Sequence, residues 1–447
     1  MRVAVIGGGI GGLTAARALV AAGFDAQVLE AGDHPGGVLG TTRVDGFLRE
    51  HAASSFLGGP SRGALALCEQ LGVPVDKASA RAKNRWIFID GKARTLPRGP
   101  FDLVRSDLLT WRGKLALLRE PFAPRRAQGH DESVHAFAAR RLGAEAARAI
   151  MAPFVTGIFA ADSHDISLEA GFPKLAELDA SGGLVRGAAK LAAKGLLAKV
   201  TGKPTAKTPR GMWAPTGGLG SLVEALAREL GSRIRTSSRV HTLAPADKSV
   251  LVNGERWDAA VLALPAHEAA TLAAAAMPEL ATKLRGFHRA PVALVYLGVD
   301  ARTVPRAADG FGCLVAQGED PRVLGIVFES TVWPNRAPDG QVLLRCIFGG
   351  GRDPSAAALP DSELIELARH DANILLDADI EPTHATVIKW QHGIAQYDVG
   401  HRDHVREAVS AGRSQRIALA GADYRGAGVN DICADADVVV AELRTWT

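Results

Sequence analysis

Apolar and polar positions along this 447-residue chain follow two periods, which together predict an α/β fold. Short apolar runs bounded by glycine, proline or charged residues predict strands that are buried on both faces. The first two are Val3–Ile6, which leads into a glycine-rich turn and an amphipathic helical segment, and Ala26–Leu29. Further along we expect a helix and a strand ending near Val240, a hairpin turning at Asn253-Gly254, and a buried strand running into Pro265.

Two long segments interrupt this pattern. Residues 131–160 have helical spacing, whereas residues 291–299, 323–330 and 342–350 are short apolar runs typical of an antiparallel sheet. We therefore expect a Rossmann-like α/β domain assembled from three pieces, with one helical and one mixed-sheet insertion. The three pieces are residues 1–84, 206–284 and 401–447, and the insertions are residues 85–205 (helical) and 285–400 (sheet).

A glycine motif follows the first strand. Gly7-x-Gly9-x-x-Gly12 opens the first helix and Glu30 ends the second strand, which is the spacing of a dinucleotide-binding fingerprint. The glycines allow a tight turn and a close approach to a pyrophosphate at the helix N-terminus, where free N–H groups and the helix dipole favour anions. Glu30 would accept hydrogen bonds from the adenosine ribose.

Two further features favour FAD over NAD. Gly36-Gly37 closely follows Glu30, and a second glycine-rich loop, which includes Gly428, stands between a strand and a helix near the C-terminus. That loop could return to the flavin. We therefore expect non-covalently bound FAD held by residues from both ends of the chain.

Charge and cysteine usage narrow the class of protein. The formal net charge is +4, but residues 94–126 hold eight basic and three acidic side chains, and residues 186–210 hold seven basic and none acidic. These segments suit an anionic membrane surface or an acidic substrate, and residues 183–200 have the pattern of an interfacial helix. The four cysteines are scattered, and no secretory or spanning pattern is present. We expect a cytoplasmic protein with reduced thiols and peripheral contact to the cell membrane, and no nucleic-acid partner.

Four longer segments indicate a protein family more specifically than the glycine motif does. They are Pro153–Gly187, Asp309–Ser330, Trp390–His401 and Gly428–Asp431. In these segments the chain resembles the oxygen-dependent protoporphyrinogen oxidases of the flavin amine oxidase superfamily. The resemblance implies a Rossmann-like FAD domain, an inserted mixed substrate-binding sheet and a helical membrane-facing domain. It also implies oxidation of protoporphyrinogen IX to protoporphyrin IX in haem biosynthesis, with O2 as acceptor and hydrogen peroxide as the second product.

The resemblance also assigns site residues. Because the flavin N5 accepts hydride, we expect no catalytic side chain and no metal. An apolar slot for the macrocycle is expected from Phe311, Gly312, Leu314, Val327 and Ile347, and Arg94 or Arg98 would pair with a propionate. The residues expected to contact FAD are Gly7, Gly8, Gly9, Ile10, Gly11, Gly12, Glu30, Ala31, Gly37, Val38, Ala52, Ala53, Ser54, Ser55, Val240, Trp390, Ala427, Gly428, Val429 and Asn430.

Three positions depart from the family pattern. Residues 52–55 are Ala-Ala-Ser-Ser where relatives often have a Gly-Pro pair, Ala395 stands where proline is common, and Val38 stands where the wider superfamily often has arginine. The first departure affects a loop whose backbone is expected to line the isoalloxazine ring.

Alternative functions stay open from the sequence alone. A coproporphyrinogen III oxidase of the same fold would need more cations around the slot, because its substrate has four propionates. An amine oxidase would need an aromatic pair facing the flavin, and this chain has only three tyrosines. A non-enzymatic scaffold would bind no flavin. A homodimer, or contact with the next enzyme of the haem pathway, is also expected.

Overall fold

A five-stranded parallel sheet carries the glycine motif in the computed structural model, which describes residues 1–59, 63–126, 129–190, 193, 209–304 and 309–446. Alternate residues of its central strand face opposite layers, as the pleat of a strand requires. Val3 and Val5 pack in one apolar cluster and Ala4 and Ile6 in another. The strand order is β10 (Ile234–Arg235), β2 (Asp25–Leu29), β1 (Arg2–Ile6), β14 (Ala259–Leu262) and β20 (Ile417–Leu419).

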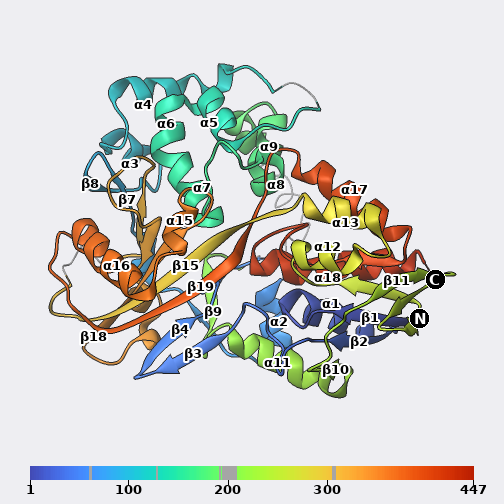
Figure 1. Ribbon diagram of the computed structural model, residues 1–447. Helices are drawn as coiled ribbons and strands as arrows, with labels where there is room; N and C mark the ends of the chain where they lie inside the picture. The colour runs from blue at the N-terminus through green and yellow to red at the C-terminus, as the bar shows by residue number, and fades with distance from the viewer. Residues whose placement is uncertain (60–62, 127–128, 191–192, 194–208, 305–308, 447) are drawn as a thin grey trace.

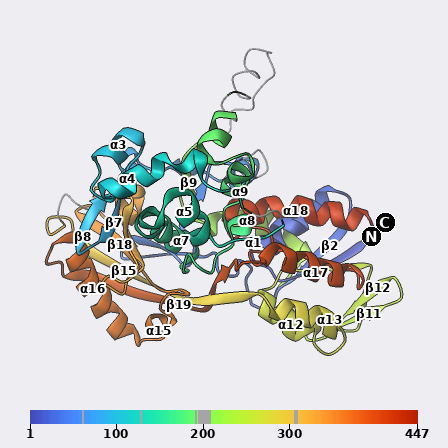
Figure 2. The same ribbon diagram turned by 90° about the horizontal axis from the view of Figure 1, so that it is seen from above.

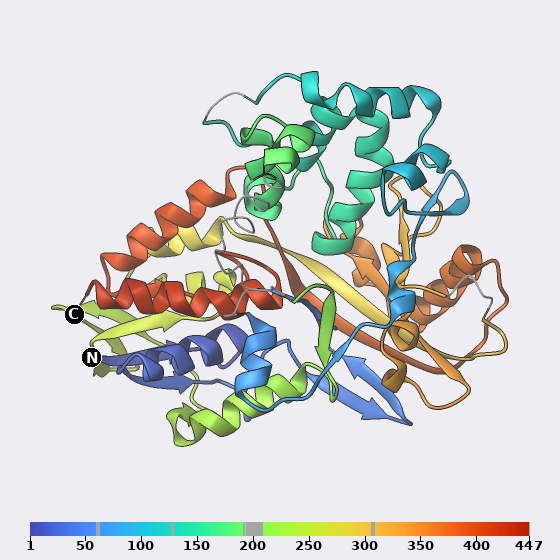
Figure 3. The same cartoon turned by 180° about the vertical axis from the view of Figure 1, so that it is seen from behind.

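Helices cover both faces of this sheet. On one face lie α1 (Ile10–Ala21), α11 (Gly220–Leu230) and α18 (Val429–Arg444). On the other lie α12 (Ala266–Ala273), α13 (Pro278–Arg285) and α17 (His401–Arg413), together with the small sheet β11 (Leu243–Ala246), β12 (Ser249–Val252) and β13 (Glu255–Trp257). Figures 1 and 3 show the N-terminal α1 beside the C-terminal α18, so the two ends of the chain meet in one layer.

A seven-stranded mixed sheet forms the second half of the molecule. One of its faces is covered by α15 (Pro354–Ala357) and α16 (Asp361–Leu376). Its two longest strands extend toward α12 and α17 and so join the two halves (Figure 2). The strand order is β19 (Pro382–Gln396), β15 (His288–Asp300), β18 (Gln341–Gly349), β17 (Gly325–Val327), β16 (Gly312–Val315), β7 (Arg85–Ile89) and β8 (Lys92–Thr95).

A helical region lies above the mixed sheet and reaches α17 (Figure 1). Its core includes Phe137, Val155 and Phe159, and the buried Arg141 forms an ion pair with Asp179 at 2.5 Å. Its helices are α3 (Pro100–Arg105), α4 (Trp111–Leu118), α5 (Val134–Leu142), α6 (Ala144–Ala146), a π-helical turn (Ala147–Met151), α7 (Ala152–Phe159), α8 (Leu168–Gly171) and α9 (Pro173–Ala180).

Short elements connect these parts. They are β3 (Thr41–Val44) paired with β4 (Phe47–Glu50), and β5 (Phe56–Leu57) and β6 (Val75–Lys77) on either side of β9 (Met212–Pro215). With them lie α2 (Ala64–Gln70) and α14 (Glu329–Val332).

The predicted α/β class, the parallel sheet and the antiparallel strands are confirmed. The hairpin at Asn253-Gly254 is present as β12–β13, and both turn residues have positive φ. Two details differ. The strand expected to end near Val240 ends at Arg235. Two residues later the chain turns at Ser237, whose φ is 50°. Residues 85–95, expected in the helical insertion, form β7 and β8 of the mixed sheet.

The sequence predicts peripheral contact to a membrane through an interfacial helix. No helix among the described residues is long and apolar enough to cross a membrane. The expected interfacial helix at 183–200 falls largely outside the described residues. A membrane-facing role for the helical region therefore stays a prediction.

Candidate functional site

The glycine turn after β1 has the geometry that its sequence predicts. Gly7 has φ of 105°, and a Cβ there would lie 2.6 Å from the Ala263 carbonyl oxygen. A Cβ on Gly12 would lie 1.9 Å from the Gly7 carbonyl oxygen. At Gly9, in contrast, the nearest atom to a Cβ is Gly37 Cα at 4.0 Å. The turn therefore leaves room for a ligand beside Gly9, at the N-terminus of α1.

Glu30 and Val240 lie near each other beyond β2 and β10. The Glu30 carboxylate accepts hydrogen bonds from the N–H groups of Gly8 at 2.6 Å and Gly32 at 2.7 Å. The Asn253 side chain binds backbone groups of residues 239, 241 and 242, on both sides of Val240. Within the described residues, the N–H and C=O of Val240 itself have no partner. This free pair suits the edge of an adenine, although Val240 lies in a loop and not at a strand end.

The C-terminal glycine loop reaches the N-terminal one. A Cβ on Gly11 would lie 3.2 Å from Gly421 Cα, and no described atom lies within 4 Å of a Cβ built on Gly421. Gly428 immediately precedes α18. The Asn430 side chain binds the Leu57 carbonyl and the Ala64 N–H, so it links α18 to β5 and α2. The C-terminal and N-terminal glycine loops thus lie side by side, and their contact with FAD stays a prediction.

Tyr397 and His401 hold the C-terminal loop in place. The Tyr397 hydroxyl donates to the Ala422 carbonyl at 2.7 Å and accepts from the Gly426 N–H at 2.8 Å. The His401 ring stacks on Tyr397 at 4.0 Å between centroids, and its Nε2 donates to the Tyr424 carbonyl at 3.1 Å. Burial lowers the pKa of His401, so the imidazole is neutral at pH 7.

The segment 50–55, which contains the departure Ala-Ala-Ser-Ser, is held by side chains of the mixed-sheet half. Trp390 Nε1 donates to the His51 carbonyl at 2.7 Å, and Arg345 Nη1 donates to the Ala52 carbonyl at 3.1 Å. The remaining donors are the Tyr296 hydroxyl, 2.6 Å from the Glu50 carbonyl, and Arg336 Nη2, 3.0 Å from the Ser54 carbonyl. The loop is therefore ordered without a proline.

Four buried charges support this segment. Arg336 pairs with Glu50 at 2.9 Å and with Glu329 at 3.3 Å, and Arg345 pairs with Glu329 at 3.0 Å. Burial raises the pKa of Glu50, while Arg336, the Thr41 hydroxyl and the Leu219 N–H oppose that rise. Two carboxylates and two guanidinium groups make the network neutral.

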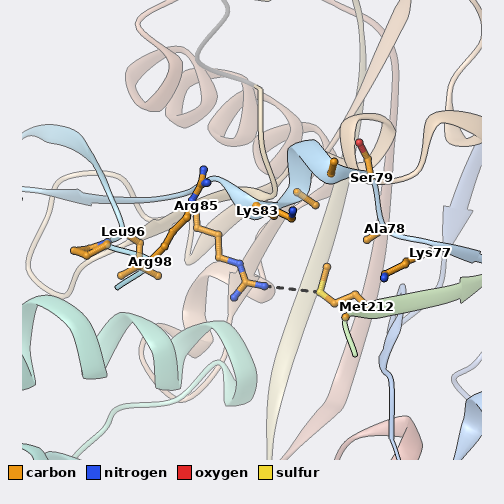
Figure 4. A pocket seen from close by; sticks show the side chains of 12 residues that line it. Lys77, Ala78, Ser79, Lys83, Arg85, Leu96, Arg98 and Met212 are labelled. Carbon is orange, nitrogen blue, oxygen red and sulfur yellow. Dashed lines mark hydrogen bonds between the residues drawn. The ribbon is translucent and has the colours of Figure 1, made fainter. Parts of the chain in front are cut away.

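A cavity of about 610 Å³ opens beside β7 and β9 (Figure 4). Its basic lining residues are Lys77, Lys83, Arg85 and Arg98, and no acidic side chain is among the described residues that line it. Arg85 is half-buried, its guanidinium lies 4.9 Å from the centre of the Phe311 ring, and burial lowers its pKa. Within the described residues Arg85 forms no ion pair. A half-buried guanidinium without a carboxylate is suited to an anionic ligand.

The expected slot residues lie close to this cavity. Val327 belongs to an apolar cluster against which Phe311 and Ile347 pack, together with Met212 and Ala78 of the cavity lining. Leu314 lies against α7, since a Cβ on Gly157 would be 3.0 Å from its side chain. Gly312 has φ of 157°, and a Cβ there would lie 2.1 Å from the Ile326 carbonyl oxygen. Strand pairing with β17 therefore requires a glycine at position 312.

The two arginines expected to bind propionate are placed differently. Arg98 lines the cavity and is exposed. Arg94 lies outside the cavity lining and pairs with Asp90 at 3.3 Å and with Asp107 at 3.9 Å. Sequence reasoning missed Arg85, because its strand was assigned to a helical segment. It also missed Phe154 and Ile158, two exposed apolar side chains of α7 on the helix that contacts Leu314.

The remaining FAD residues are placed as follows. Ala31, Gly37 and Val38 are exposed between β2 and β3, and Ala52, Ala53 and Ser55 are half-buried. Ala427 is half-buried and Val429 is buried at the start of α18. All four cysteines are buried, and burial raises the pKa of Cys68 to about 12. No group of three or more metal-binding side chains occurs in the described ranges.

Comparisons with known proteins bear on this site. The family model for flavin containing amine oxidoreductases matches residues 10–431. The chain is 29% identical over 434 residues to a chloroplastic protoporphyrinogen oxidase of Oryza sativa subsp. japonica, covering 91% of this chain and 81% of the relative. It is 31% identical over 477 residues to a coproporphyrinogen III oxidase of Propionibacterium freudenreichii subsp. freudenreichii, covering 97% and 88%.

A solved structure from Exiguobacterium sp. 255-15, provisionally assigned as a protoporphyrinogen oxidase, superimposes with a TM-score of 0.82 at 23% identity. The superposition covers 100% of this chain and 99% of the Exiguobacterium chain, and so shows that the two proteins have the same fold.

The chain belongs to the flavin-containing amine oxidoreductase family, as the sequence resemblance predicts. It is an FAD-dependent oxidoreductase of the protoporphyrinogen oxidase family. The described residues fit FAD: the open side of Gly9 suits the pyrophosphate, the free backbone groups of Val240 suit the adenine, and the backbone at Gly421, beside Gly11, is open to a ligand.

Proposed function

We propose that the protein oxidises a porphyrinogen to the porphyrin, with protoporphyrinogen IX as the first candidate substrate. The cavity beside Arg85 carries this proposal, because it combines four basic side chains with apolar walls next to the slot residues. A porphyrinogen needs both features, since it is a flat apolar macrocycle with anionic propionates. The names of the relatives support this substrate class and place the reaction in tetrapyrrole biosynthesis.

The chain's own residues bind and orient the substrate in this proposal. The guanidinium of Arg85 holds a propionate through charge-assisted hydrogen bonds, with Arg98 at the open side of the cavity. Phe311, Val327 and Ile347 contact the macrocycle and exclude water. Bound FAD would supply three successive two-electron oxidations, with one O2 restoring its oxidised form each time and yielding one hydrogen peroxide.

Coproporphyrinogen III is the second candidate substrate. Four cations line one cavity, and a substrate with four propionates would use more of them. An amine substrate has less support, because Tyr296, Tyr397 and Tyr424 are all buried and none lines the cavity.

Steady-state oxidation of the two porphyrinogens, followed by porphyrin fluorescence and hydrogen peroxide, tests this proposal. We expect kcat/KM for protoporphyrinogen IX to exceed that for coproporphyrinogen III. The reverse order would assign the second substrate, and turnover of neither would reject the proposed function.

We also propose that α4 contacts a membrane. Trp111, Leu115, Leu118 and Phe122 follow helical spacing and are 55% to 81% exposed, and Phe101 of α3 is 86% exposed. Arg112 and Arg119 lie exposed between them. An apolar stripe flanked by arginines suits a bilayer interface with anionic lipids. The segment 183–200, expected to make the peripheral membrane contact, lies largely outside the described residues. The exposed surface of α4 is therefore the candidate that the structure offers for this contact.

A further inference from the structure

Three backbone carbonyls of the segment 51–55 are held by side-chain donors. The carbonyls of His51, Ala52 and Ser54 accept hydrogen bonds from Trp390, Arg345 and Arg336. Because the C=O and N–H of a planar trans peptide point in opposite directions, the N–H groups of residues 52, 53 and 55 point away from these donors. Across the described ranges, none of those three N–H groups meets an acceptor.

The other side of this segment faces the cofactor half of the molecule. Ala52 and Ala53 pack against the apolar cluster of the parallel sheet, α1 and α18. Three unpaired N–H groups on a partly buried loop are costly unless a ligand accepts from them. A flavin ring offers carbonyl oxygens and ring nitrogens that can accept such bonds.

We infer that Arg345 is a positioning residue for the flavin. By holding the Ala52 carbonyl, its guanidinium turns the Ala53 N–H toward the cofactor. The inference depends on FAD lying between the two sheets and not on the identity of the substrate.

The surroundings of Arg345 indicate a role beyond stability. Its side chain is 9% exposed, it pairs with the fully buried Glu329, and it stands opposite Tyr296 across β15 and β18. Buried ion pairs are often no more stabilising than apolar residues of similar size. An arginine here does what an apolar residue could not, because it donates to a backbone carbonyl while Glu329 balances its charge.

Two variants separate this role from simple stabilisation. The double variant Arg345→Met/Glu329→Gln removes one positive and one negative charge, so Arg336 and Glu50 remain a balanced pair. Arg345→Lys keeps the charge beside Glu329 and removes the planar fork that reaches the carbonyl. Arg352→Met is the matched control: Arg352 also donates to backbone carbonyls, those of Val315 at 2.9 Å and Ala316 at 3.3 Å, but it does not touch residues 51–55.

The readouts come from the flavin alone. For both Arg345 variants we expect FAD binding to be weaker by up to about tenfold in fluorescence titration, because the Ala53 N–H is no longer aligned for its hydrogen bond to the flavin. We also expect a changed visible spectrum and midpoint potential of the bound flavin, and none of these changes in Arg352→Met.

A folded double variant with wild-type affinity, spectrum and potential would overturn the inference. If the double variant does not fold, Arg345→Lys decides, and wild-type flavin properties there would overturn the inference in the same way. Substrate turnover is not needed for any of these measurements, so failure of the proposed function would not affect them.

Discussion

The guanidinium of Arg85 stands 4.9 Å from the ring centre of Phe311. This pair joins β7 to the residue just before β16, where the two strands run parallel. A cation over an aromatic face is attracted by the ring quadrupole. The contact fixes a positive charge at the border between the cavity and the apolar slot. A substrate with one anionic edge and one apolar body would be oriented by this border.

Replacing Arg85 by Met should weaken substrate binding while FAD stays bound. A charge-assisted hydrogen bond contributes about 1.5–3 kcal/mol, so KM should rise roughly tenfold to hundredfold. Arg98→Met should have a smaller effect, because Arg98 is exposed. Steady-state kinetics with both porphyrinogens measures the change. Arg94→Met is the matched control, since Arg94 pairs with Asp90 and Asp107, and an equal effect there would contradict the role given to the cavity.

Leu314→Arg should impair substrate binding and leave flavin occupancy unchanged. The side chain packs against Gly157 of α7, so a longer charged group would enter the space beside the slot. We expect a loss of kcat/KM of at least about tenfold, the cost of about 1.4 kcal/mol. Kinetic constants equal to wild type would place the substrate on another surface.

Gly9→Val should give a folded but colourless protein. The Cβ position of Gly9 is open to 4.0 Å, so the fold accommodates a side chain that blocks the pyrophosphate. Gly12→Ala is the contrast, because its Cβ would collide with the Gly7 carbonyl and disturb the fold itself. Absorbance of the flavin and far-UV circular dichroism separate the two outcomes. A yellow Gly9→Val protein with full flavin content would refute the pyrophosphate assignment.

Acidification below pH 6.5 should lower the thermal stability. Burial lowers the pKa of His401, and likewise of His135 and His267. The unfolded chain, with histidine pKa values of about 6.5, then binds more protons than the folded state, so stability present above pH 6.5 is lost as the pH falls through the folded pKa values. Each histidine contributes a slope of at most about 1.4 kcal/mol per pH unit.

Melting temperatures from pH 8 to pH 5 measure this loss. The variant His401→Gln should have a shallower decline, because one of the titrating groups is gone. An unchanged slope in that variant would show that His401 does not contribute to the pH dependence.

Leu115→Glu should weaken binding to anionic liposomes in flotation at low salt. The change places a negative charge in the middle of the exposed apolar stripe of α4. High salt should weaken the wild-type interaction too, because the arginine contribution is screened. Val438→Glu is the matched control, since Val438 is also exposed but lies on α18. Wild-type protein that stays unbound at low salt would disprove the membrane surface.

Local signals in the sequence predicted the cofactor half well. The turn from Gly7 to Gly12 and the hairpin at Asn253 each depend on residues close together in the chain. The part of Glu30 in binding the ribose stays a prediction. The sequence also indicated a second glycine-rich loop near the C-terminus, and in the structure Gly421 of that loop lies beside Gly11.

Long-range pairing was not predictable in the same way. Arg85 belongs to a strand that pairs with residues near 312, and nothing in residues 80–95 signals this partner. The apolar side chains of Phe154 and Ile158 have helical spacing that is typical of a core, yet they are exposed. The support of residues 50–54 depends on side chains from four distant elements, so the sequence alone left the order of this loop undecided.

The position of β20 and α18 has a consequence for biosynthesis. These elements complete the parallel sheet beside β14 and close the loop at Gly421, yet they follow the whole mixed sheet in the chain. Domains fold as they leave the ribosome, N-terminal parts first. The strands of residues 288–396 therefore emerge before the parallel sheet is complete. If the C-terminal loop contacts FAD as predicted, cofactor capture is expected to wait until residues 417–444 have been translated. The newly made chain passes through a flavin-free state every time it is synthesised.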